Sequence, residues 1–175
     1  MNKKFALYLF LIAFLVAGVI LYAWLGGFKD PAITVVDAGP YYVAGKKFHS
    51  RLNDKALGNF FNEAEELGSK AYPDGTVAGI FYNEPVKPTD TISAFIGIAF
   101  SAKPDSLPEN YSLDSLPARR VVEARIESHY LVVPVNIYAK IQEYAKQQNM
   151  KLQMTPALEL YPGENKLVVQ VPVAD

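Results

Sequence analysis

The chain has 175 residues, no cysteine, 50% hydrophobic residues and a formal net charge of −1. The lack of cysteine excludes disulfide bonds, thiolate catalysis and cysteine-based zinc sites. Two lysines and no acidic residue fall within residues 1–27, so the rest of the chain holds 15 basic and 18 acidic residues and a net charge of −3. That charge balance argues against nucleic acid as a partner.

The N-terminal segment is long and apolar enough to cross a membrane. Residues 5–24 carry no charge, and about 20 helical residues span roughly 30 Å, the thickness of the hydrocarbon core. Lys3 and Lys4 precede this run, which predicts a cytoplasmic N-terminus and a domain on the outer side. We therefore predict a single-pass anchor at residues 1–27 that contacts the lipid bilayer through residues 5–24. A cleaved signal peptide is the alternative.

Residues 28–32 form a short tether in this interpretation, and residues 33–175 form the domain. The first half of the domain has the pattern of one β-α-β-β unit. Its expected elements are one strand over 33–48 interrupted at Gly39-Pro40, a helix over 57–67 capped by Asn53 or Asp54, and strands over 76–82 and 92–100.

The second half repeats the pattern after a connector over 101–118 that holds three prolines. Its expected elements are a strand over 119–126, a helix whose apolar stripe includes Ile137, Ile141, Tyr144 and Ala145, and strands over 156–161 and 166–173. Two β-α-β-β units predict an α+β fold, with a continuous antiparallel sheet and both helices on one face. The other face is then free to hold a ligand.

Two short apolar-aromatic runs that end in proline turns, at 79–85 and 157–163, occupy equivalent places in the two units. We expect them to form the walls of a cleft between the halves. Glu159 stands out because it interrupts an apolar strand, where an ionised carboxylate is costly to bury without a partner. With period-two alternation, Glu159 and Tyr161 share a face. If the neighbouring leucines face the helices, both side chains face the cleft.

There the Glu159 carboxylate is a candidate for attracting a cation, assisted by aromatic rings, or for acting as a general base if burial raises its pKa. The alternative is an ordinary solvated residue on a half-exposed strand. Matching the aromatic residues of the two runs places Tyr82 on the same face as Tyr161. Tyr42 and Tyr111 are further candidate wall residues.

Metal and cofactor sites are not predicted. His49 and His129 are the only histidines, and neither has companion ligands at metal-binding spacing. Haem binding through one of them is a weak further hypothesis. The sequence also lacks a nucleophilic-serine elbow and a phosphate-binding glycine loop.

Four motifs resemble those of GyrI-like small-molecule-binding domains. Residues 79–85 are similar to the family's G-I-Y-Y-D-D-P, residues 116–122 to I-P-A-G-R-Y-A, residues 158–161 to the E-x-Y of the closing strand, and residues 170–173 to the terminal I-P-V. Arg119 replaces the family's glycine, and Pro162 follows the tyrosine. The resemblance covers about residues 33–173.

This resemblance implies a fold shared with SOUL haem-binding proteins and with the effector domains of multidrug-sensing regulators. In those regulators the acidic residue of the closing strand meets cationic aromatic drugs, a role that would fall on Glu159. Other members of the family hydrolyse cyclopropane-containing toxins with help from a glutamate, and Glu159 is again the matching position. The resemblance favours a bacterial envelope version of the domain.

Three functions follow as hypotheses. The first is a membrane-anchored module that binds a small, apolar or cationic molecule between the two halves. The second is a hydrolase of strained-ring electrophiles that uses Glu159. The third is a non-catalytic protein-interaction domain, for which the sequence names no protein partner.

Overall fold

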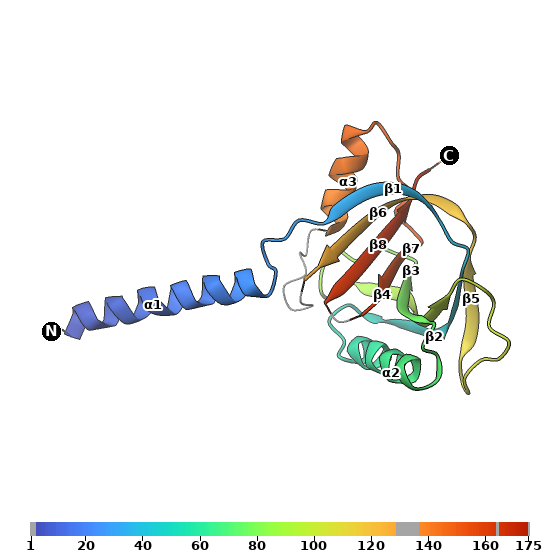
Figure 1. The fold of residues 1–175 in the computed structure, drawn as a ribbon, viewed down its shortest axis with the longest axis horizontal. Helices are drawn as coiled ribbons and strands as arrows, with labels where there is room; N and C mark the ends of the chain where they lie inside the picture. Colours follow the sequence, from blue (N-terminus) through green and yellow to red (C-terminus); the bar gives the residue numbers. More distant parts are fainter. Residues whose placement is uncertain (1–2, 129–136, 164, 175) are drawn as a thin grey trace.

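The computed structural model describes residues 3–128, 137–163 and 165–174. Figure 1 shows the long helix α1 leading into a domain built on one curved sheet. In chain order the elements are α1 (Lys3–Trp24), β1 (Ala32–Ala38), β2 (Tyr41–Arg51), α2 (Ala56–Ala71), β3 (Thr76–Phe81), β4 (Thr91–Phe100), β5 (Ser112–Leu116), β6 (Arg119–Glu127), α3 (Ile137–Gln147), β7 (Ala157–Tyr161) and β8 (Lys166–Pro172).

The eight strands form a single antiparallel sheet in the order β1-β6-β8-β7-β3-β4-β2-β5. Two β-α-β-β units, β2-α2-β3-β4 and β6-α3-β7-β8, can be followed in this order. They meet where β3 pairs with β7 at the centre of the sheet. The predicted α+β fold with duplicated units is therefore confirmed.

Both helices pack on the same face of the sheet through apolar stripes. The buried residues of α3 are Ile137, Ile141 and Ala145, which join a core cluster on β6 and β8. Residues of α2 that include Phe60 and Phe61 pack against a cluster on β2 and β4. The predicted helix start is also found, because the Asp54 carboxylate accepts a 2.9 Å hydrogen bond from the Ala56 amide.

Two local expectations are wrong. Residues 33–48 form two separate strands, because β1 pairs with β6 at one edge of the sheet while β2 pairs with β4 and β5 near the other. The chain turns between them at Gly39, whose φ of 85° favours glycine. The expected connector over 101–118 contains the edge strand β5.

The sheet face away from the helices is not free, contrary to expectation. A buried cluster that includes Val43, Ile80, Phe95 and Leu158 fills it. The sheet curves so strongly that Gln170 on β8 donates a 3.1 Å hydrogen bond to the hydroxyl of Tyr41 on β2, although three strands separate β8 from β2 in the sheet order. This face is therefore closed on itself as a second core layer.

The pair Gly45 and Gly97, opposite each other on β2 and β4, permits this curvature. A Cβ added to Gly97 would lie 1.9 Å from the carbonyl oxygen of Ala44, and one added to Gly45 would lie 2.4 Å from the carbonyl oxygen of Ile96. At this pair of residues the two neighbouring strands therefore lie at a close spacing that only glycine allows.

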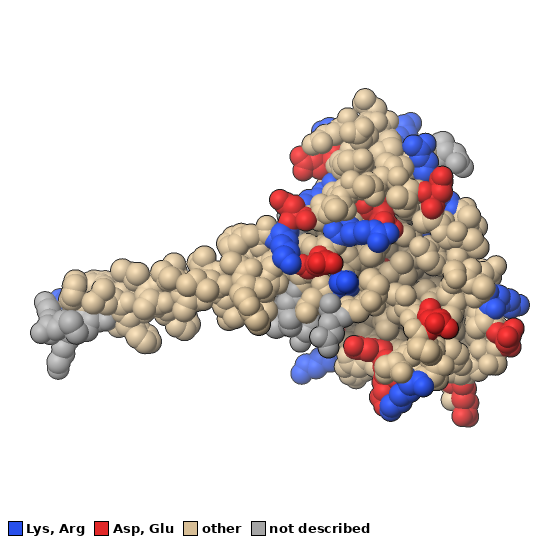
Figure 2. Space-filling view, in the orientation of Figure 1, with Lys and Arg blue, Asp and Glu red and all other residues tan. Residues whose placement is uncertain are grey.

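Helix α1 projects from the domain (Figure 1). Its segment Leu7–Trp24 has a mean hydropathy of 2.4 and is not buried against the rest of the protein. In the space-filling view, α1 shows no charged side chain between its ends, whereas the domain surface carries both signs of charge (Figure 2).

Candidate functional site

Strand register places Glu159 on the helix side of the sheet. Glu159 is paired with Gly79 on β3, and Gly79 in turn lies opposite Ile96, which belongs to the cluster that packs on α2. Directly paired residues share a face, so Glu159 and Tyr161 face the layer of α2 and α3. Leu158 belongs to the core on the other face. The leucines therefore do not face the helices, so the condition under which Glu159 would face a cleft on the opposite side of the sheet is not met.

Two tyrosine hydroxyls hold the Glu159 carboxylate. Tyr138 on α3 donates a hydrogen bond of 2.6 Å to Oε1, and Tyr161 on the same strand donates one of 2.6 Å to Oε2. Burial raises the pKa of Glu159, and the two hydrogen bonds oppose this rise because they stabilise the ionised form. The pKa of Tyr161 is raised as well, by burial and by the adjacent carboxylate.

A pocket of about 1050 Å³ lies beside this group. Its lining combines aromatic and other apolar side chains with about as many polar or charged ones. The residues used below are Phe61, Glu65, Tyr72, Ser128, Tyr161, Lys166 and Leu167. The Phe61 and Tyr161 rings meet edge to face, with centroids 5.2 Å apart. Tyr161 thus connects the pocket to Glu159, which lies behind the tyrosine rather than in the lining.

Gly79 makes room for this arrangement. An added Cβ would lie 2.9 Å from Cε2 of Phe81 and 3.3 Å from Cζ of Phe61. The position opposite Glu159 is therefore occupied by aromatic rings of the first unit. The sequence pattern did not reveal this, nor did it reveal the Tyr138 contact, which joins residues on different elements.

Tyr82 lies away from Glu159. Because Val77 pairs with Tyr161, the residues of β3 on the Tyr161 face are Val77, Gly79 and Phe81, so the match of aromatic residues that placed Tyr82 there is wrong. Tyr82 donates a hydrogen bond to the Asp114 carboxylate on β5. Burial and this carboxylate raise the pKa of Tyr82.

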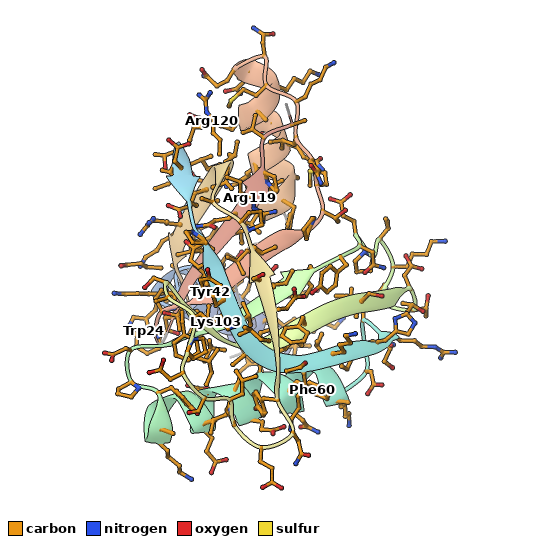
Figure 3. All side chains as sticks on the ribbon, turned by 90° about the vertical axis from the view of Figure 1, so that its right-hand side faces the viewer. Trp24, Tyr42, Phe60, Lys103, Arg119 and Arg120 are labelled. Carbon is orange, nitrogen blue, oxygen red and sulfur yellow. The ribbon has the colours of Figure 1, made fainter. Side chains whose placement is uncertain are left out.

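Tyr42 and Tyr111 also lie away from the pocket. Tyr42 is on β2, separated from β7 by β3 and β4, and Figure 3 labels it in a view from the side of the domain opposite α1. Tyr111 lies below Lys46, whose Nζ is 4.8 Å from the ring centroid. Burial, together with the nearby Glu63 carboxylate, raises the pKa of Tyr111 to about 12.

The remaining candidates have other partners. His49 Nδ1 lies 2.8 Å from the Ser93 hydroxyl, while His129 lies outside the described residues. Arg119, where the family pattern has glycine, donates a 3.0 Å hydrogen bond to the Pro156 carbonyl. Within the part of the chain that the structure describes, no group of three or more histidine, aspartate or glutamate side chains is arranged to hold a metal ion.

The raised pKa of Glu159 predicts a pH-dependent stability. Between the ordinary value of 4.5 and the higher value in the folded state, the folded protein binds more protons than the unfolded chain. The free energy of unfolding therefore falls as pH rises through this window. Glu159→Gln carries no titrating group, so we expect wild type to lose stability relative to this variant above about pH 4.5.

Thermal unfolding of both proteins, followed by circular dichroism from pH 4 to pH 8, measures this difference. A gap in melting temperature that stays constant, or that changes in favour of wild type as pH rises, would contradict a raised pKa for the partly buried Glu159 carboxylate.

The architecture defines a class of protein: two β-α-β-β units sharing one antiparallel sheet, with both helices on one face and a pocket beside the central strand pair. Within this class, the sequence pattern described as the GyrI-like small molecule binding domain matches residues 31–173. The chain belongs to this family. Comparison with curated protein sequences gives no match.

Solved structures share the fold at low sequence identity. A complex of EcmrR with DNA matches with a TM-score of 0.60 and 12% identity over 98% of this chain and 69% of that chain. An integron cassette protein from the mobile metagenome of Vibrio cholerae matches with a TM-score of 0.56 and 16% identity over 81% of this chain and 95% of that one. SAV2435 bound to tetraphenylphosphonium matches with a TM-score of 0.52 and 16% identity over 82% and 94% of the two chains.

Proposed function

We propose that this protein is a membrane-anchored module that binds a small lipophilic cation in the pocket between α2 and the second unit. The observation that carries the proposal is the Glu159 carboxylate, held by Tyr138 and Tyr161 next to an aromatic-lined pocket. Membership of a small-molecule-binding family supports a small-molecule ligand. The uncharged, unburied segment Leu7–Trp24 of α1 supports the anchor at residues 1–27.

Physical chemistry favours a cation with an apolar body. The pocket offers the faces and edges of Phe61, Tyr72 and Tyr161, and aromatic faces attract cations. Glu65 and Lys166 both line the pocket, and Lys166 is paired with Glu127, its Nζ 3.7 Å from Oε1. The negative charge offered to a ligand therefore comes from Glu65 and, behind Tyr161, from Glu159. Because the Glu159 carboxylate is only partly exposed, its attraction for a bound cation is stronger than between groups in bulk water.

Hydrolysis with Glu159 as the general base is the second candidate, and the raised pKa of that carboxylate favours it. Both carboxylate oxygens, however, already accept hydrogen bonds from tyrosines. A base in this position must exchange one of those hydrogen bonds for a substrate or a water molecule. Binding requires no such exchange, so it is our first choice.

The pocket proposal is tested with tetraphenylphosphonium and the full chain in detergent micelles. Isothermal titration should show saturable binding at one site per chain. Phe61→Leu keeps an apolar side chain but removes a ring from the pocket, so we expect its affinity to fall about tenfold, the size of a desolvated cation–π contact.

The matched control is Phe60→Leu. Phe60 is the neighbouring residue on α2, but its ring packs on Phe48, 5.4 Å between centroids, and it does not line the pocket. Its affinity for tetraphenylphosphonium should match wild type. Absence of saturable binding to wild type, or equal losses in the two variants, would reject the pocket as the site.

A further inference from the structure

One residue, Ser128, both lines the pocket and contacts the chain at the end of helix α1. Ser128 follows β6, is only 4% exposed and lines the pocket. The Ser128 hydroxyl can donate a hydrogen bond to the carbonyl oxygen of Leu25, at 3.2 Å, or to that of Gly26, at 3.1 Å. Leu25 and Gly26 directly follow the end of α1. One wall of the pocket is therefore in contact with the end of the helix.

Further contacts hold the end of α1 against the domain. Gly26 is buried and has a φ of 84°, and a Cβ added there would lie 3.1 Å from the Ser128 hydroxyl oxygen. Asp30 in the tether forms an ion pair with Lys140 on α3. Figure 1 shows the end of β6 and the start of β8 on the side of the domain that α1 approaches. The pocket-lining residues Lys166 and Leu167 belong to that start of β8.

These contacts fix the depth of the pocket relative to a membrane. With 22 residues, α1 is about 33 Å long, close to the roughly 30 Å of a bilayer hydrocarbon core. An α1 that spans the core therefore ends at its boundary. Leu25, Gly26 and the attached Ser128 then lie at the level of the lipid headgroups. Trp24 and Phe28, which are 81% and 68% exposed, flank this level, where aromatic side chains are favoured.

We propose that the pocket takes its ligand from the membrane interface, and that this ligand is an amphiphilic cation dissolved in the adjacent leaflet. The inference rests on the proposed anchor and on the proposed binding of a cation. The apolar side chains of Phe61, Tyr72 and Leu167 receive the hydrocarbon part, and the charges of Glu65 and Glu159 attract the cationic group. The Ser128 contact holds the pocket at the depth where such molecules concentrate.

The test compares two probes with the same cationic group in nanodiscs of phosphatidylcholine. Dodecyltriphenylphosphonium partitions into the bilayer, whereas methyltriphenylphosphonium remains largely in water. The full chain is compared with a variant that has ten Gly/Ser residues inserted between Gly27 and Phe28 together with Ser128→Ala. A flexible insertion of this length adds a root-mean-square distance of about 17 Å, enough to lift the domain from the headgroups.

We expect the apparent affinity for the dodecyl probe to fall about tenfold in the lifted variant, because the local concentration at the pocket falls. Ser128→Ala without the insertion is the reference for both affinities, because Ser128 lines the pocket, and the affinity for the methyl probe should be the same in the lifted variant as in this reference. An identical insertion after Lys103, in the exposed connector, is the control and should change neither affinity by a comparable factor.

Equal affinities for the dodecyl probe in the lifted and original proteins would overturn membrane-side entry while leaving cation binding intact. Equal losses for both probes would show that the insertion damages the pocket itself, and would also overturn it. Failure of both probes to bind the original chain would reject the proposed function and the inference together.

Discussion

Glu159→Gln should weaken the binding of tetraphenylphosphonium about 10- to 100-fold. The variant keeps the size of the side chain and an oxygen that can accept a tyrosine hydrogen bond, but removes the negative charge. A charge pair about 6 Å apart at an effective dielectric constant of about 20 contributes roughly 2–3 kcal/mol, and each 1.4 kcal/mol changes affinity about tenfold. Isothermal titration of the full chain measures the change.

Tetraphenylborate provides a sharp companion probe because it has nearly the same shape and the opposite charge. The same substitution should strengthen its binding. Glu143→Gln, on the exposed surface of α3, changes the net charge equally and should leave both affinities near wild type. If Glu159→Gln shifts both probes in the same direction, shape rather than charge controls binding, and Glu159 is not the cation-attracting group.

The same variant separates binding from catalysis. If the protein hydrolyses a strained-ring electrophile with Glu159 as base, turnover should disappear in Glu159→Gln. Turnover that survives the substitution would assign the reaction to other groups.

Gly97→Ala should destabilise the domain by about 3 kcal/mol, at the upper end of the usual cost of overpacking. The added methyl group meets backbone, the carbonyl oxygen of Ala44 at 1.9 Å, so no side-chain rotation can relieve the contact. Strands β2 and β4 must separate or lose curvature, and both changes disturb the second core layer. For a domain of this size the melting temperature should fall by about 10 °C.

Gly58→Ala is the matched control because it makes the same chemical change on α2, where no atom lies within 4 Å of the added Cβ. Alanine favours a helix over glycine by about 1 kcal/mol, so this variant should melt slightly higher than wild type. Thermal unfolding of the full chain in detergent, followed by circular dichroism, compares the two. A Gly97→Ala protein as stable as wild type would contradict the close crossing of β2 and β4.

The sequence predicted the repeated units and the apolar stripes of α2 and α3 because these depend on local periodicity. It also singled out Glu159, since a charged residue in an apolar strand is conspicuous in one dimension. It could not assign Glu159 to a layer, because both faces of the curved sheet carry apolar cores. Alternation then shows that Leu158 and Glu159 point apart, but not which of them faces the helices.

Long-range pairing explains the other differences. Along the sequence, only Gly39-Pro40 separates β1 from β2. The sequence could not show that they pair in different parts of the sheet, because the partner of β1 is β6, far along the chain. Tyr138 reaches Glu159 only after α3 has packed on the sheet. Tyr82 was misplaced because the two aromatic runs align in more than one way, and the pairing of Val77 with Tyr161 selects one of them.

Gly79, opposite Glu159, makes the two sides of the proposed site different from each other. The two units resemble each other in topology, but the central strand pair offers a carboxylate on β7 and no side chain at the facing position of β3. A symmetric pair of acids would accept two equivalent ligands or a ligand in either orientation. Because the central strand pair holds one carboxylate and rings of the first unit pack over the glycine, we expect one ligand per chain, with its cationic group on the β7 side.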